Sequence, residues 1–335
     1  TVETAAQQPE VRWQPDPIER SKWRDERVGI NRLVVLLDGS IFAAQALPAA
    51  KSIASATGAE ITLLSSVKDH TPQLQAQYED TRRAREVYLN DVAEELIQEG
   101  YRVDYEVRPG HIADATQQLI REDGIDLVVT STRGKSGTTH WIRGGVSRKL
   151  TQKICIPVLL VQDTDDVNGG IPKIDRILVA LDGSINSERV LPYARALAKA
   201  FDSELVLVTV PAVPEVKNYR AAAEIVETIR AKAEVDIRKF LEAVARTLRE
   251  DGINVRTVVS GSIPAPTIVQ ISEEQDADMI MLTSRGRGGM DIVLTGSVAQ
   301  QVVQITPEPI FMMPILVQVG EDESVDQVAP CAEIS

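Results

Sequence analysis

Short apolar runs alternate with longer amphipathic stretches through most of the chain. The runs have the length of buried strands, and the stretches between them repeat apolar residues with the helical period. This alternation predicts α/β units in which parallel strands are covered by helices on both faces. The predicted strands span residues 32–37, 60–67, 102–108, 127–131 and 158–162, and again 176–181, 204–210, 254–260, 279–283 and 310–313. The predicted helices span residues 41–55, 73–99, 112–122 and 146–153, with counterparts in the second half.

The second half of this pattern is a copy of the first. Residues 32–40 read RLVVLLDGS and recur as RILVALDGS in residues 176–184, a shift of 144 positions. Gly100 and Asp126 recur as Gly252 and Asp278 at a shift of 152, so one gap of eight residues reconciles the two halves. The sequence therefore predicts two tandem, open, five-stranded parallel sheets of the Rossmann-like α/β class. We expect copy one at residues 30–162 and copy two at residues 174–318, with an N-terminal arm (1–29), a linker (163–173) and an acidic tail (319–335).

The first helix of each copy carries two local signals. Ser40 and Ser184 stand where an N-cap is expected, able to accept a backbone N–H of the first turn. Pro48 and Pro192 lie inside the same predicted helices. Because proline has no N–H, we expect each to remove one helical hydrogen bond and to kink its helix.

Composition and charge narrow the class of partner. The 335 residues are 43% apolar and carry a formal net charge of −13. A net negative field disfavours nucleic acid and anionic membrane surfaces as partners. No apolar run approaches the roughly 18 residues that would span a bilayer. Cys155 and Cys331 lie far apart in the sequence, which suggests neither a disulfide framework nor a metal knuckle. We therefore expect a protein of the cytoplasm.

The arm before the first copy holds two of the three tryptophans, Trp13 and Trp23. A disordered leader would explain its polar composition. A strap that packs these aromatic side chains on a neighbouring surface would explain the tryptophans equally well. Both interpretations of the arm stay open.

An aspartate ends the first strand of each copy. Ligands of open parallel sheets bind outside the carboxyl ends of the strands, where the strand order reverses. Asp38 and Asp182 are placed there, each followed by glycine and a helix start. A turn carboxylate near a helix N-terminus is one interpretation. The other is a ligand group that accepts hydrogen bonds from ribose hydroxyls or helps to hold a phosphate-bound metal.

Two glycine turns follow the fourth strand of each copy. Gly134 and Gly144 are ten residues apart in copy one, and Gly286 and Gly296 are ten apart in copy two. Glycine lets successive backbone N–H groups approach an anion closely, and the next helix N-terminus adds partial positive charge. The equal spacing in both copies favours phosphate binding.

Other nucleotide and hydrolase motifs are absent from the sequence. It contains no G-x-x-x-x-G-K-[ST], no G-x-G-x-x-G after the first strand and no G-x-S-x-G elbow. His70, His111 and His140 have no histidine partner in the other copy, so each is interpreted as a surface or loop residue. No evident general base is present, and at most slow ATP hydrolysis would be expected.

These residues together resemble a tandem member of the universal stress protein family. The nucleotide-binding members of that family carry G-x-x-G, nine residues, then G-[ST], after the fourth strand. Copy two matches at Gly286 and at Gly296-Ser297, with Thr283 in place of the first glycine. The resemblance covers about residues 29–161 and 174–318.

Copy one matches the same motif with different departures. It keeps Gly134 and Gly144, has Ser131 at the first position, and has Gly145 in place of the hydroxyl residue. Ser147 follows two residues later. We expect at least one occupied site, with a preference for copy two.

The resemblance implies the strand order 3-2-1-4-5, pairing through the fifth strands, and ATP, ADP or AMP as ligand, with or without Mg²⁺. It implies that Asp38 and Asp182 meet the ribose region and that the backbone near Val67 and Val210 meets adenine. It further implies a set of phosphate-binding residues: Gly134, Gly144, Gly145 and Ser147 in copy one, and Gly286, Gly296, Ser297 and Val298 in copy two.

Two functions from different classes follow. The first is an adenine-nucleotide (ATP) binding protein acting in stress response or signalling through an unknown protein partner. The alternative is a nucleotide-independent interaction scaffold built on the intramolecular pseudo-dimer. A further homodimer is open in both cases.

Overall fold

The computed structural model describes residues 28–68, 75–132, 154–162, 173–211, 223–261, 263–284 and 296–315. Copy one contains β1 (Arg32–Leu36), α2 (Ile41–Ala44), α3 (Ala46–Thr57), β2 (Glu60–Val67), α4 (Gln75–Gln98), β3 (Val103–Pro109), α5 (Ile112–Asp123), β4 (Leu127–Ser131) and β5 (Val158–Val161). Copy two contains β6 (Arg176–Ala180), α8 (Ile185–Glu188), α9 (Leu191–Phe201), β7 (Glu204–Thr209), α10 (Ala223–Glu250), β8 (Val255–Val259), α11 (Pro264–Glu274), β9 (Met279–Thr283), α12 (Ser297–Ile305) and β10 (Ile310–Met313).

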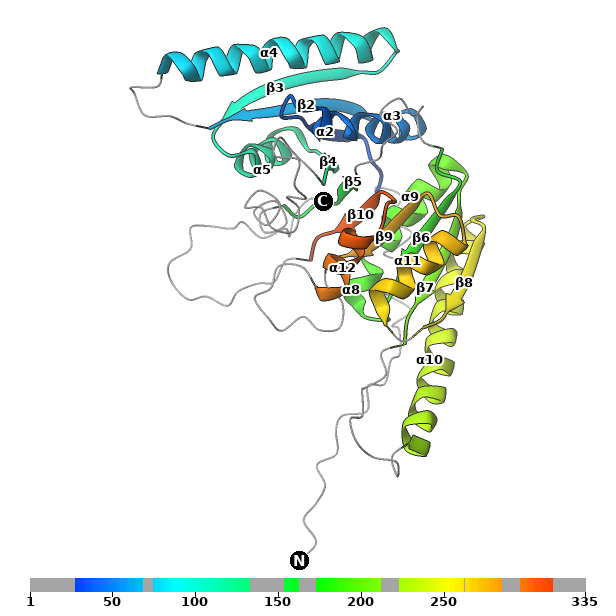
Figure 1. The fold of residues 1–335 in the computed structure, drawn as a ribbon. Helices are drawn as coiled ribbons and strands as arrows, with labels where there is room; N and C mark the ends of the chain where they lie inside the picture. The colour runs from blue at the N-terminus through cyan, green and yellow to red at the C-terminus, as the bar shows by residue number, and fades with distance from the viewer. Residues whose placement is uncertain are drawn as a thin grey trace, which may run out of the picture.

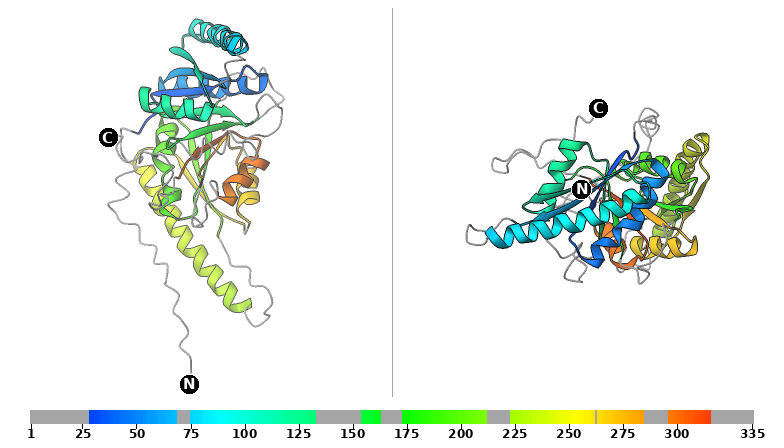
Figure 2. Two further views of the ribbon diagram at one scale, coloured as in Figure 1. Left: turned by 90° about the vertical axis from the view of Figure 1, so that its left-hand side faces the viewer. Right: turned by 90° about the horizontal axis from the view of Figure 1, so that it is seen from above.

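The strands form one continuous ten-stranded sheet in the order β3-β2-β1-β4-β5-β10-β9-β6-β7-β8 (Figure 1). Within each copy every neighbouring pair is parallel, and the order is 3-2-1-4-5 in both. The predicted α/β class and strand order are therefore confirmed. The two halves meet edge to edge where β5 pairs antiparallel with β10, with Phe311 opposite Leu159. Figure 2 shows the two halves from the side and from above.

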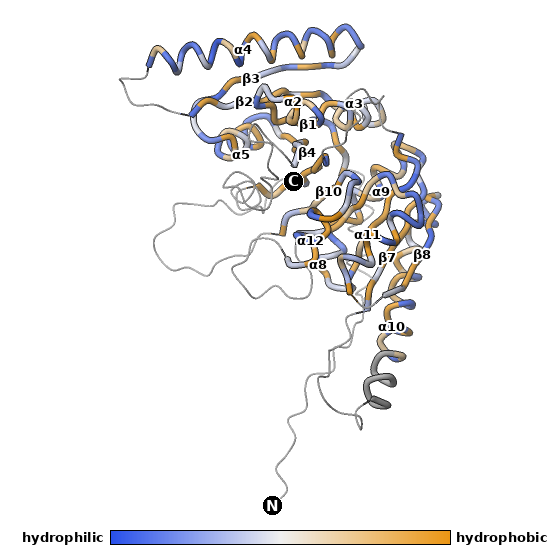
Figure 3. The backbone as a smooth tube through the Cα atoms, in the orientation of Figure 1, coloured by the Kyte–Doolittle hydropathy of each residue, from blue (hydrophilic) through white to orange (hydrophobic). Residues whose placement is uncertain are grey.

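Helices cover both faces of the sheet, because side chains on each strand alternate between faces. Leu33 and Val35 of β1 belong to one core cluster, which includes buried apolar residues of α3, α4, α9 and α10. Val34 and Leu36 belong to the other, which includes those of α5, α11 and α12. Inner strands such as β5 and β9 are therefore buried on both faces, whereas the edge strands β3 and β8 carry charged side chains. Figure 3 shows the hydrophilic colour along α4 and near β8.

Asp126 and its counterpart in copy two, Asp278, have a structural role. Oδ2 of Asp126 accepts the backbone N–H groups of Asn31 and Arg32 at 2.7 and 3.0 Å. Oδ2 of Asp278 accepts those of Asp175 and Arg176, both at 2.8 Å. Each carboxylate thus accepts hydrogen bonds from the N–H groups at the start of its central strand. The repeated aspartate therefore stabilises the fold.

The first helix of each copy is broken, not kinked. In copy one α2 ends at Ala44 and α3 begins at Ala46, so Pro48 lies in the first turn of α3. In copy two Pro192 is the second residue of α9. The first N–H groups of a helix have no partner within it, so proline costs nothing there. The prediction of a kink inside one long helix is wrong for this reason.

Cys155, shortly before β5, is disulfide-bonded. The prediction from sequence spacing did not include a disulfide, because separation along the chain says nothing about separation in space. The other cysteine, Cys331, lies outside the described residues.

No helix among the described residues is long and apolar enough to cross a bilayer. In the same part of the chain no group of three His, Cys, Asp or Glu side chains is arranged to hold a metal ion.

A buried glutamine joins the two copies. Gln162 follows β5 and is 8% exposed. Its Oε1 accepts the hydroxyl of Thr132 at 2.9 Å, and its Nε2 donates to the carbonyl of Val303 in α12, also at 2.9 Å. That carbonyl has no helical partner, because the residue four positions later is Pro307. The glutamine therefore satisfies a carbonyl that the sequence of copy two leaves unpaired.

We expect Gln162→Leu to lower the free energy of unfolding by about 2 kcal/mol, since it leaves a buried hydroxyl and a buried carbonyl without partners. Urea unfolding followed by circular dichroism measures the change. The control is Gln118→Leu, an exposed glutamine bonded to Glu122, which should stay within about 0.5 kcal/mol of the parent. Equal effects of the two substitutions would contradict the bridging role.

Candidate functional site

The candidate sites lie at the carboxyl ends of the central strands. In copy one β1 pairs with β2 on one side and with β4 on the other. In copy two β6 lies in the same way between β7 and β9. The strand order reverses at these positions, which is where open parallel sheets bind ligands. Each copy therefore has one switch point at the end of its central strand.

In copy one the switch point is occupied by a turn built on Asp38. Its Oδ1 accepts the backbone N–H of Ser40 at 3.0 Å and the Ser40 hydroxyl at 2.5 Å. The Ser40 Oγ in turn accepts the N–H of Ala43 at 3.1 Å, which confirms the predicted N-cap of α2. Gly39 between them has φ +71°, a conformation that L side chains rarely adopt. The half-buried carboxylate is thus held in place by the helix start.

Copy two repeats this turn almost bond for bond. Oδ1 of Asp182 accepts the N–H and the hydroxyl of Ser184 at 2.9 and 2.6 Å. The Ser184 Oγ accepts the N–H of Ser187 at 3.2 Å and caps α8. Gly183 has φ +76°. The local role of both aspartates as turn carboxylates is therefore established, whereas their role towards a ligand stays a prediction.

The predicted adenine positions lie at the ends of the neighbouring strands. Val67 is the last residue of β2 and is buried, and its carbonyl accepts the N–H of Gly110 at 2.8 Å. Val210 directly follows β7, one residue beyond the observed end of that strand, and its partly buried side chain packs against the second core cluster. Both residues flank their switch points, next to the aspartate turns.

The glycine turns are described only at their ends. Gly134, Gly144, Gly145, Ser147 and Gly286 lie outside the described residues.

In copy two the described ends of the glycine segment meet each other. The N–H of Gly296 donates to the carbonyl of Ser284 at 2.6 Å, and the Ser284 hydroxyl accepts the N–H of Ile315 at 2.9 Å. Gly296 is the N-cap of α12, in extended conformation and with no side-chain cap. The first N–H groups of α12, from Ser297 and Val298, therefore keep their partial positive charge beside the switch point.

Two residues on α4, Arg85 and Tyr88, contact the turn of copy one and were not predicted. A Cβ built on Gly39 would collide with Nη1 of Arg85 and lie 3.5 Å from its Cζ and 4.0 Å from Cδ1 of Tyr88. Burial raises the pKa of the Tyr88 phenol above its ordinary value, and the negative charge of Asp38 raises it further. Their matched positions in copy two, Ile237 and Phe240, differ in chemistry. Comparing the two long helices at the shift of 152 would have identified this difference.

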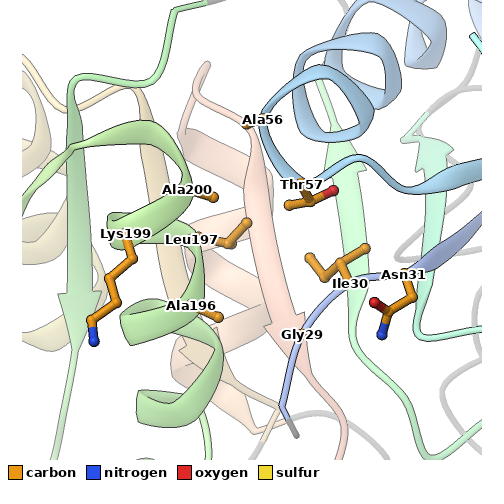
Figure 4. A pocket seen from close by; sticks show the side chains of 9 residues that line it. All are labelled: Gly29, Ile30, Asn31, Ala56, Thr57, Ala196, Leu197, Lys199 and Ala200. Atoms are coloured by element: carbon orange, nitrogen blue, oxygen red, sulfur yellow. The ribbon is translucent and has the colours of Figure 1, made fainter. Parts of the chain in front are cut away.

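A pocket of about 340 Å³ lies elsewhere, at the junction of the two copies (Figure 4). It lies at the N-terminal end of β1, beside Ile30 and Asn31, whereas the aspartate turns lie at the carboxyl ends. The helices α3 and α9 form its other walls, with Thr57 on one and Leu197 and Lys199 on the other. It contains none of the predicted site residues.

Comparison with known proteins identifies the family. The Universal stress protein family matches residues 29–162 and 173–314. Universal stress protein YxiE of Bacillus subtilis is 28% identical over 145 residues, covering 42% of this chain and 98% of its own. Universal stress protein Rv2623 of Mycobacterium tuberculosis is 30% identical over 194 residues, covering 57% of this chain and 62% of its own.

Solved structures show the same fold over most of the chain. A universal stress protein from Archaeoglobus fulgidus aligns with a TM-score of 0.60 at 21% identity, covering 84% of this chain and 95% of that one. A protein from Pseudomonas aeruginosa described as a putative universal stress protein aligns with a TM-score of 0.59 at 19% identity, covering 85% and 93%. With the family matched once in each copy, the chain belongs to the universal stress protein family as a tandem member.

Proposed function

We propose that this chain binds an adenine nucleotide, ATP in the first place, and acts in stress response or signalling through that bound state. The observation that carries the proposal is the duplicated switch-point turn. Asp38 and Asp182 are held in the same geometry at the reversal of strand order in both copies. The helix N-caps themselves are supplied by Ser40 and Ser184, so the repeated carboxylate beside a glycine segment supports a ligand role.

Each part of the site would recognise a different part of the nucleotide. A carboxylate whose Oδ1 is already held by serine can accept ribose hydroxyls, which donate hydrogen bonds. The uncapped N–H groups of Ser297 and Val298 at the start of α12 suit phosphate oxygens. The backbone near Val67 and Val210 would receive the adenine ring. The carboxylates would also suit Mg²⁺ bound to the phosphates.

Identification of bound nucleotide is the direct test. Protein purified without added nucleotide is denatured, and released small molecules are identified by mass and counted per chain. At an ATP concentration 100 times the dissociation constant, binding should raise the free energy of unfolding by about 2.7 kcal/mol. Urea unfolding with and without Mg·ATP measures this change.

Two double variants test the switch-point aspartates, and each removes two carboxylates from the protein. Asp38→Ala combined with Asp182→Ala should abolish the ATP-dependent stabilisation. Asp91→Ala combined with Asp236→Ala, on exposed positions of α4 and α10, should leave it unchanged. Absence of released nucleotide together with no stabilisation by ATP in the parent protein would instead favour the nucleotide-independent scaffold, in which the joined sheet is itself the functional unit.

A further inference from the structure

The long helices of the two copies, α4 and α10, can be matched residue by residue. Both end in the same turn, in which Tyr101 N–H donates to Leu96 O in copy one and Ile253 N–H donates to Leu248 O in copy two. The buried residues Leu89, Ala93 and Leu96 recur at the same shift of 152 as Leu241, Ala245 and Leu248, which are also buried. Arg85 therefore corresponds to Ile237, and Tyr88 corresponds to Phe240.

The Arg85 guanidinium lies on the turn of copy one. The space that a Cβ on Gly39 would fill is taken by its Nη1, with Cζ directly behind. Tyr88 lies one helical turn from Arg85, and the charges of Asp38 and Arg85 shift the pKa of its phenol in opposite directions. A cation and a carboxylate therefore lie together at this switch point. Arg85 is half-buried, and no hydrogen bond or ion pair joins it to another residue that the structure describes. The side chain therefore covers the turn, and no hydrogen bond or ion pair within the described part of the chain fixes it there.

Copy two has no cation at the matched position. Ile237 is 8% exposed and Phe240 is 3% exposed, so both side chains are buried, and Phe240 belongs to the first core cluster. Neither isoleucine nor phenylalanine has a charged group that could interact with the carboxylate of Asp182. The position that carries an arginine on the turn in copy one is thus held by a buried apolar side chain in copy two.

We propose that Arg85 closes the adenosine position of copy one, so that copy two holds nucleotide more tightly and copy one binds it only when the guanidinium moves aside. This inference rests on the proposed function of the same sites. To bind beside Asp38, a nucleoside must displace the guanidinium from Gly39 and compete with its attraction for the carboxylate. Moving and re-ordering one such side chain costs about 0.5 to 1.5 kcal/mol, which corresponds to an affinity difference of up to about tenfold.

The test measures each site alone by calorimetric titration with Mg·ATP. In the Asp182→Ala background, which reports copy one, Arg85→Ile should tighten binding by up to about tenfold. Arg85→Gln keeps a polar side chain but shortens it and removes the charge, and it should also tighten binding. The control is Arg83→Ile, which removes the same charge from an exposed position of α4 and should change nothing.

The reciprocal variant tests the matched position. In the Asp38→Ala background, which reports copy two, Ile237→Arg should weaken Mg·ATP binding by about tenfold. Unchanged or weaker binding by both Arg85 variants would overturn the inference and leave the proposed function standing. Failure of the parent protein and of every variant to bind Mg·ATP would overturn the proposed function, and this inference with it.

Discussion

Replacing Phe311 with alanine is expected to lower the free energy of unfolding by about 4 kcal/mol. Phe311 lies in the middle of β10, opposite Leu159 of β5, and is fully buried. Its ring lies 5.6 Å from that of Tyr193 on α9, tilted by 43°. Truncation removes this aromatic pair and opens a cavity at the strand pair that joins the copies. A single domain typically has only about 5 to 15 kcal/mol of stability, so this loss is large.

Urea unfolding followed by circular dichroism measures the effect, and Phe311→Leu is the matched control. Leucine keeps most of the buried volume, so we expect a loss of about 1 kcal/mol. A cost for alanine no greater than that for leucine would mean that the junction tolerates a void. Such a result would contradict the close packing described here.

Replacing Gly296 with aspartate should separate folding from binding in copy two. The residue has φ −60° and ψ 150°, which any L-amino acid can adopt, and it is the N-cap of α12. Aspartate is a preferred N-cap and should add up to about 1 kcal/mol of stability. The same carboxylate would face the proposed phosphate position, where two charges 4 Å apart at an effective dielectric near 20 repel by about 4 kcal/mol. We therefore expect at least about 100-fold weaker Mg·ATP binding.

The Asp38→Ala background isolates copy two for this measurement. Calorimetric titration gives the affinity, and urea unfolding without nucleotide gives the stability. Gly296→Ser is the control, because serine also caps the helix but brings no charge. Equal ATP affinity of the aspartate and serine variants would exclude the start of α12 as a phosphate site.

The two copies share the aspartate turn and differ at the long-helix position matched to Arg85. Both hold an aspartate turn at the switch point through the same serine contacts. Arg85 covers that turn in copy one, whereas the matched Ile237 in copy two is buried. Under the proposal made for Arg85, the site of copy two would be ready for nucleotide and the site of copy one would be conditional.

Much of the fold could be predicted, because its signals are local. The spans of β2, β4, β9 and β10 agree with the predicted strands at both ends. The serine caps were predicted correctly as well, since an N-cap depends only on the residues next to it. The helix break before Pro48 and the disulfide at Cys155 were not. A break depends on how a short helix packs on the sheet, and a disulfide depends on distances in space.

The sequence by itself determined that the chain is a duplicated α/β unit with an aspartate and a glycine segment at each switch point. Periodicity, turn residues and repeats are properties of neighbouring positions, so they can be recognised without coordinates. Only the tertiary structure decided that Gln162 satisfies a carbonyl of α12 and that Arg85 lies on Gly39. Each of these contacts joins residues far apart along the chain, and the packing of side chains on a common sheet brings them together.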